Sequence, residues 1–72
     1  MTLEELIAKT LNISVDLVVD ALGFQSISEW DSLAHVNLMV ALDERYGTSI
    51  DEDQMVELTT VAAIRAFVGK MQ

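Results

Sequence analysis

Residues 28–46 read SEWDSLAHVNLMVALDERY, and this stretch decides the fold. Its apolar residues recur at intervals of three and four, which is the spacing of one face of an α-helix. We therefore predict one long helix that ends at Gly47, because glycine readily takes the left-handed conformation that closes a helix. The face expected to meet the core consists of His35, Leu38, Met39, Leu42 and Tyr46.

A second apolar line runs beside the first on the same predicted helix. It comprises Leu33, Val36 and Val40 and continues toward the acids Asp43 and Glu44, with Asn37 among them. A helix at the surface of a small domain needs only one apolar stripe to face its core. The second line therefore indicates either deeper burial of the helix or contact with a partner.

The start of this helix carries the residues of greatest chemical interest. The Asp31 side chain can accept hydrogen bonds from free amides of the first turn, so we predict it as the N-cap. Ser32 then takes the first helical position and faces outward near the positive end of the helix dipole, where a phosphate ester would lie among unpaired amides. Two plainer interpretations remain open: Ser32 is itself the cap, or Ser28 and Asp31 form a capping box and Ser32 is incidental.

Capping residues predict helices on either side of this stretch. Thr2 and Glu5 have the spacing of a capping box and precede a first helix that reaches Leu11. Asp51 and Gln54 precede a short third helix, for which a solvated acidic loop is the alternative. Thr59 or Thr60 is expected to cap a last helix. Arg65 and Lys70 are expected on the outside of this helix. Its apolar face consists of Val61, Ile64, Phe67, Val68 and Met71.

The segment between the first helix and the central one has a weaker pattern. A short helical piece is expected over Val15, Val18, Val19 and Leu22. Residues 23–30 read as a loop in which Phe24 and Ile27 anchor onto the core. Trp30 either staples the helix start by packing near His35 or forms an exposed contact surface.

These segments together predict an all-α fold in a single domain over residues 1–72. The expected architecture is a small antiparallel helical bundle with three main helices and one or two short ones. A domain of this size buries only about 60% of the surface of its unfolded chain, so a deep active site is not expected.

The composition excludes several classes of function. The chain has no cysteine and one histidine, which excludes the usual zinc sites, and the acids Asp51 and Asp53 lack the glycine and spacing of a calcium loop. A net charge of −8 argues against nucleic-acid binding, and no apolar run approaches the length of a membrane span. We expect a soluble, cytoplasmic monomer.

The negative charge is concentrated in one part of the chain. Residues 29–57 hold eight acids and one base, a net charge of −7. Such a field favours encounters with basic partner surfaces. The alternative is that these acids form only a solvated face that keeps a small domain soluble.

Ser32 and His35 lie three residues apart on the predicted helix, which raises the question of a hydrolytic pair. No acid is placed to orient the imidazole, and no glycine-rich stretch offers an oxyanion hole. We therefore assign no catalytic residue, and we expect His35 to be packed in the core.

Asp31-Ser32-Leu33 at the start of a long acidic helix resembles the attachment motif of the acyl carrier proteins. The resemblance extends from Leu11 to Thr60 without a gap, with Phe24 at an aromatic anchor position. It implies a four-helix carrier that is not an enzyme. It also implies that Ser32 accepts 4′-phosphopantetheine, transferred from coenzyme A by a separate magnesium-dependent phosphopantetheinyl transferase, and that the arm then carries an acyl or aminoacyl thioester.

The resemblance further implies a docking surface for partner enzymes on the central helix. Its expected members are Val36, Asn37, Val40, Asp43 and Glu44. The expected partners, besides the transferase, are an acyl- or aminoacyl-loading ligase and downstream transferases with basic docking surfaces.

Three residues depart from the pattern of fatty-acid carriers. Asn37 replaces a usual glutamate, Asp51 replaces a common proline, and Trp30 replaces a small residue. Asn37 argues against docking to fatty-acid enzymes, and Trp30 favours a freestanding carrier of a specialised pathway over one of housekeeping fatty-acid synthesis. The rival hypothesis is an acidic helical interaction module that carries no prosthetic group.

Overall fold

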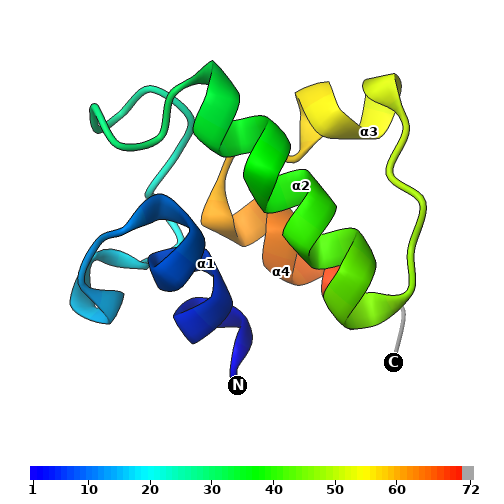
Figure 1. Cartoon of the computed structure of the whole chain (residues 1–72), viewed down its shortest axis with the longest axis horizontal. Coiled ribbons are helices and arrows are strands. Elements are labelled where there is room, and N and C mark those ends of the chain that lie inside the picture. Colours follow the sequence, from blue (N-terminus) through cyan, green and yellow to red (C-terminus); the bar gives the residue numbers. More distant parts are fainter. Residues whose placement is uncertain (71–72) are drawn as a thin grey trace.

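The computed structural model describes residues 1–70, and within them the chain is helical and contains no strand. The elements are α1 (Leu3–Leu11), the 3₁₀ turn η1 (Val15–Leu17), α2 (Ser32–Tyr46), α3 (Glu52–Glu57) and α4 (Val61–Gly69). In Figure 1, α2 crosses the view diagonally, with α1 on one side of it, α3 on the other and α4 passing behind. The prediction of a small all-α bundle is confirmed. None of these helices is both long and apolar enough to cross a membrane.

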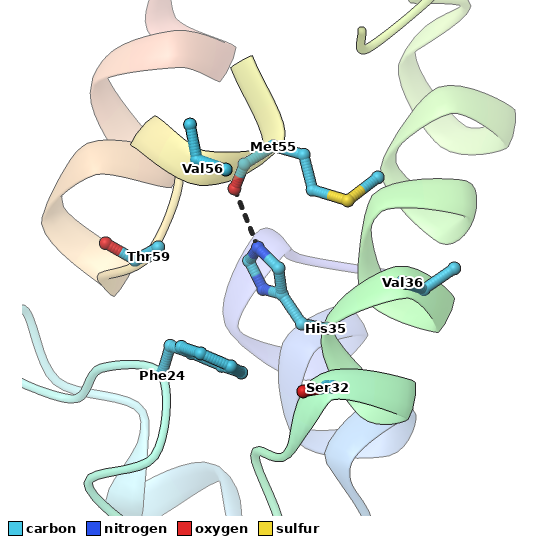
Figure 2. Close-up of a pocket in the computed structure, with 7 residues that line it drawn as sticks. All are labelled: Phe24, Ser32, His35, Val36, Met55, Val56 and Thr59. Carbon is cyan, nitrogen blue, oxygen red and sulfur yellow. Dashed lines mark hydrogen bonds between the residues drawn. The ribbon is translucent and has the colours of Figure 1, made fainter. Parts of the chain in front are cut away.

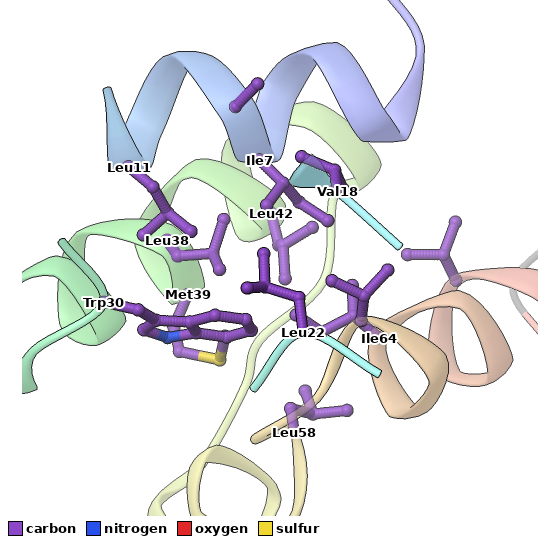
Figure 3. Close-up of a cluster of buried hydrophobic side chains, with 13 residues drawn as sticks. Ile7, Leu11, Val18, Leu22, Trp30, Leu38, Met39, Leu42, Leu58 and Ile64 are labelled. Carbon is purple, nitrogen blue, oxygen red and sulfur yellow. The ribbon is translucent and has the colours of Figure 1, made fainter. Parts of the chain in front are cut away.

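One cluster of buried side chains joins α1, α2 and α4 (Figure 3). The connecting segments also contribute to it, since Val18, Leu22, Trp30 and Leu58 are buried in the same cluster. The predicted core face of α2 is correct: Tyr46 is half-buried against the cluster, and the buried residues are His35, Leu38, Met39 and Leu42. The central helix therefore supplies the middle of the core.

The predicted caps set most of the helix boundaries. The Thr2 hydroxyl accepts from the Glu5 amide at 3.1 Å, and the Glu5 carboxylate accepts from the Thr2 amide at 2.9 Å. Hydrogen bonds from the Thr2 backbone and side chain lower the pKa of Glu5 below its ordinary value. Asp51 and Gln54 form a second capping box before α3, so the acidic-loop alternative for that segment is wrong.

Other boundaries differ from the sequence-based predictions or refine them. The short piece after α1 is a single 3₁₀ turn, because Val18 leaves the helical region and turns into the core while Val15 and Val19 stay exposed. Thr60, and not Thr59, caps α4, with its hydroxyl 3.0 Å from the Ala63 amide. The predicted core contribution of Met71 lies outside the described residues.

Gly23 allows the loop before α2 to lie against the start of α4. The Phe24 amide donates to the Thr59 carbonyl at 2.7 Å, and the Val61 amide donates to the Leu22 carbonyl at 2.9 Å. A Cβ atom at Gly23 would lie 3.1 Å from the Thr59 carbonyl oxygen, which is closer than ordinary packing allows. This close approach fixes the loop that leads to Trp30 and the start of α2.

Arg65 joins three segments at the surface. Its guanidinium lies 2.8 Å from a Glu4 carboxylate oxygen on α1 and 2.9 Å from one of Asp20 in the loop after η1. The prediction that Arg65 lies outside the apolar face of α4 is correct. Its exposure means that each ion pair adds little stability, on the order of 0–1 kcal/mol.

Leu42→Ala should destabilise the protein by about 2–5 kcal/mol, because Leu42 is completely buried in the central cluster and its removal leaves a cavity. Urea denaturation followed by circular dichroism measures the loss. Leu33→Ala on the same helix is the matched control, since Leu33 is 71% exposed and its truncation should change little. Equal stability of native protein and Leu42→Ala would show that the core face of α2 is wrongly assigned.

Candidate functional site

The start of α2 has the geometry that the sequence predicts. The Asp31 carboxylate accepts from the Ala34 amide at 2.8 Å, so Asp31 is the N-cap and Ser32 is the first helical residue. The interpretation of Ser32 as the cap is therefore wrong. The Ser28 hydroxyl donates to the Glu29 carboxylate at 3.1 Å, and Ser28 does not form a capping box with Asp31.

Ser32 is exposed and lies at the edge of a pocket of about 420 Å³ between the loop, α2 and α3. Figure 2 shows its hydroxyl oxygen on the side of α2 that faces Phe24. The pocket is lined by Phe24, Ser32, His35, Val36, Met55, Val56 and Thr59. Its wall is largely apolar, and the first-turn amides beside Ser32 have no partner within the helix.

Two hydrogen bonds hold the His35 side chain in this wall. The Trp30 Nε1–H donates to His35 Nδ1 at 3.0 Å, and His35 Nε2 lies 2.8 Å from the Met55 carbonyl oxygen. An indole N–H can only donate and a carbonyl oxygen can only accept, so Nδ1 accepts, Nε2 carries the proton and the ring is neutral. We call this pair of hydrogen bonds the His35 bridge. It connects the loop, α2 and α3.

The aromatic surroundings fix the imidazole as well. The Phe24 and Trp30 ring centroids lie 5.3 and 6.0 Å from that of His35, and Trp30 is completely buried. The prediction that Trp30 staples the helix start near His35 is confirmed, and the exposed-contact alternative is wrong. Sequence reasoning missed the contact with Met55, because the two residues lie 20 positions apart with no shared motif.

The His35 bridge also excludes the hydrolytic pair. Both imidazole nitrogens are occupied by Trp30 and Met55, so neither is available to take a proton from the Ser32 hydroxyl. A base for nucleophilic catalysis needs a free nitrogen within hydrogen-bond reach of the hydroxyl.

The second apolar line of α2 lies at the surface. Leu33, Val36 and Val40 are 71%, 43% and 50% exposed, so the alternative of deeper burial is wrong. Val56 on α3 is also exposed, at 72%. Asn37 and Glu44 are exposed along the same helix. Contact of this line with a partner stays a prediction.

Asp43 has a structural role that the sequence pattern did not indicate. Its carboxylate accepts from the Thr48 hydroxyl at 2.6 Å and from the Ile50 amide at 3.0 Å, and the residue is half-buried. These bonds hold the turn that follows Gly47, the left-handed residue that ends α2. Its negative charge is therefore less available to a partner than that of Glu44.

Comparison with known protein families agrees with this site. A family model described as "Phosphopantetheine attachment site" matches residues 2–68. The chain belongs to this family. It is a carrier protein that bears covalent 4′-phosphopantetheine, and it is not itself an enzyme. The match covers all four α-helices except the last residue of α4.

The residues at the start of α2 fit such a group in this carrier. A phosphate diester on an exposed hydroxyl would lie beside unpaired first-turn amides, where the helix dipole favours negative charge. The apolar pocket next to Ser32 offers a surface for the uncharged part of an attached arm.

Removing the N-cap should destabilise the carrier. Asp31→Ala should cost about 0.5–2 kcal/mol, because the Ala34 amide loses its partner. Asp31→Asn is the matched control, since asparagine caps helices about as well as aspartate and should retain most of the stability. Urea denaturation measures both. An equal loss in the two variants would mean that the charge of Asp31, and not its capping bond, stabilises the helix start.

Proposed function

We propose that Ser32 is the residue to which 4′-phosphopantetheine is attached, and that the protein presents thioester-linked acyl or aminoacyl groups to partner enzymes. The observation that carries the proposal is the Ser32 hydroxyl, which is exposed at the first position of α2 on the rim of an apolar pocket. The family match supports the identity of the group.

Neighbouring serines are less suited to this role. The Ser26 hydroxyl donates to the Gly23 carbonyl at 2.6 Å and accepts from the Gly23 amide at 3.0 Å. Ser28 donates to Glu29. The Ser32 hydroxyl takes no part in the bonds that cap α2, so its modification leaves the helix start intact.

The chemistry of attachment follows from the donor. The Ser32 Oγ atom forms a bond to the β-phosphorus of coenzyme A, the pyrophosphate bond breaks, and adenosine 3′,5′-bisphosphate leaves while the hydroxyl proton is lost. A separate magnesium-dependent transferase supplies the base and the metal ion. When bound, the arm supplies a terminal thiol that holds the cargo as a thioester.

Partner enzymes are proposed to dock on α2 beside Ser32. The exposed line of Leu33, Val36 and Val40 offers an apolar contact, and Asn37, Asp43 and Glu44 surround it with polar and acidic groups. A small apolar patch framed by charge suits transient partners, because charge speeds the encounter and the patch supplies the contact. The proposed partners are the phosphopantetheinyl transferase, a loading ligase and downstream transferases of a specialised pathway.

Incubation with coenzyme A, magnesium and a permissive phosphopantetheinyl transferase should add one phosphopantetheine to the native protein. Ser32→Ala should gain no mass, because the accepting oxygen is missing. Intact-protein mass spectrometry measures the gain, and Ser28→Ala is the matched control that should be modified like the native protein. A gain in Ser32→Ala, or none in the native protein with several transferases, would contradict the proposal and favour a binding module without a prosthetic group.

Charge reversal on the docking surface should slow the same modification. Glu44→Lys should lower its rate several-fold at low salt and much less at high salt, because salt screens charges farther apart than the Debye length. Asp43 is left unchanged, since its carboxylate holds the turn after α2.

Asp16→Lys is the control for this charge reversal. It changes the net charge equally on an exposed residue of η1. Rates of Glu44→Lys and Asp16→Lys that agree at every salt concentration would contradict docking on α2.

A further inference from the structure

The innermost wall of the pocket separates it from the hydrophobic core. His35 lines the pocket yet is only 6% exposed, and the completely buried Trp30, which does not line the pocket, donates a hydrogen bond to the Nδ1 atom of its ring. Figure 2 shows the imidazole reaching from α2 toward α3 across the pocket, and Figure 3 shows Trp30 beside Met39 in the core. A chain that entered the core from the pocket would have to displace this imidazole.

The imidazole is held more firmly than an apolar side chain of its size. Moving it breaks both hydrogen bonds of the His35 bridge at once and leaves the Trp30 N–H and the Met55 carbonyl without partners. Phe24 and Trp30 pack against the ring at 5.3 and 6.0 Å between centroids. Unpaired buried polar groups are costly, so the ring resists displacement.

We propose that the His35 bridge closes the core to short cargo, so that this carrier holds acyl or aminoacyl groups up to about the length of octanoyl at its surface and does not enclose them. This inference rests on the proposed attachment at Ser32. At the upper end of the cost of an unpaired buried polar group, about seven methylene groups must be buried to offset the loss of both partners, which is about the length of an octanoyl chain. A shorter cargo gains nothing by entering and stays accessible to partner enzymes. His35 is thus a specificity-determining residue, and Trp30 and Met55 are the groups that position it.

The test loads the protein with acyl chains of increasing length. A permissive transferase attaches acetyl-, butyryl-, hexanoyl- and octanoyl-phosphopantetheine from the corresponding acyl-coenzyme A, and intact mass confirms each product. Methyl NMR then follows the pocket through Val36, Met55 and Val56, and the core through Leu38, Leu42 and Ile64. We expect the acyl chain to shift pocket signals only, and the melting temperature to stay constant from acetyl to octanoyl.

Two variants and one control identify the closing group. In His35→Ala, the core signals should shift with hexanoyl and octanoyl, and the melting temperature should rise with chain length. Trp30→Phe keeps an aromatic ring but removes one hydrogen bond of the bridge, and it should show the same trend more weakly. This variant provides the test if His35→Ala does not fold. Val19→Ala, an exposed position away from the pocket, should behave like the native protein.

Two results would overturn the inference, and a third would overturn the attachment on which it rests. Core signals that move progressively with chain length in the native protein would show that the core is open. Core signals that stay fixed in the folded variants would show that another feature excludes the chain. Absence of a mass gain would instead count against attachment and remove the basis for both proposals, so failure of the attachment is distinguished from failure of the closed core.

Discussion

Two hydrogen bonds to one imidazole hold together the three segments that surround the site. The His35 bridge ties the loop through Trp30 and α3 through Met55 to the central helix. A 72-residue domain has a total stability on the order of 4–11 kcal/mol. A buried polar group left without a partner costs about 1–3 kcal/mol, so the loss of this one bridge removes a substantial part of that stability. The position of α3 relative to Ser32 depends on it.

The same helix serves the core and the surface. Leu38, Met39 and Leu42 face inward, whereas Val36 and Val40 face outward and are 43% and 50% exposed. A domain this small has one core, and α1 and α4 already cover the inner face of α2. The outer face is therefore exposed, next to the residue proposed to carry the arm. This arrangement places the proposed attachment residue and the proposed docking surface on one helix.

Local sequence chemistry predicted the helix ends, because each cap involves residues within a few positions of each other. Thr2 with Glu5, Asp31 and Gly47 all act as their residue types and spacing indicate. The choice between Thr59 and Thr60 was not decided by sequence, since either hydroxyl can cap the helix. The packing of Gly23 against Thr59 favours Thr60, because it fixes the chain direction just before α4.

Contacts between distant residues were the part that sequence could not predict. The 3.6-residue period placed His35 toward the core, but its partners are a loop indole and a backbone carbonyl that no periodic pattern brings together. Asp43 was predicted as part of the docking surface, and its bonds to Thr48 and Ile50 depend on how the chain turns after α2. The pocket beside Ser32 depends on the first of these arrangements, because His35 and Met55 both line it.

The central claim is that the prosthetic group is attached at the start of α2. Fragmentation of the intact modified protein in a mass spectrometer locates the added phosphopantetheine among the serines of this region, Ser26, Ser28 and Ser32. The account predicts that every fragment carrying the added mass contains Ser32, and that fragments ending before Asp31 are unmodified. Added mass on a fragment that ends before Asp31 would contradict the account.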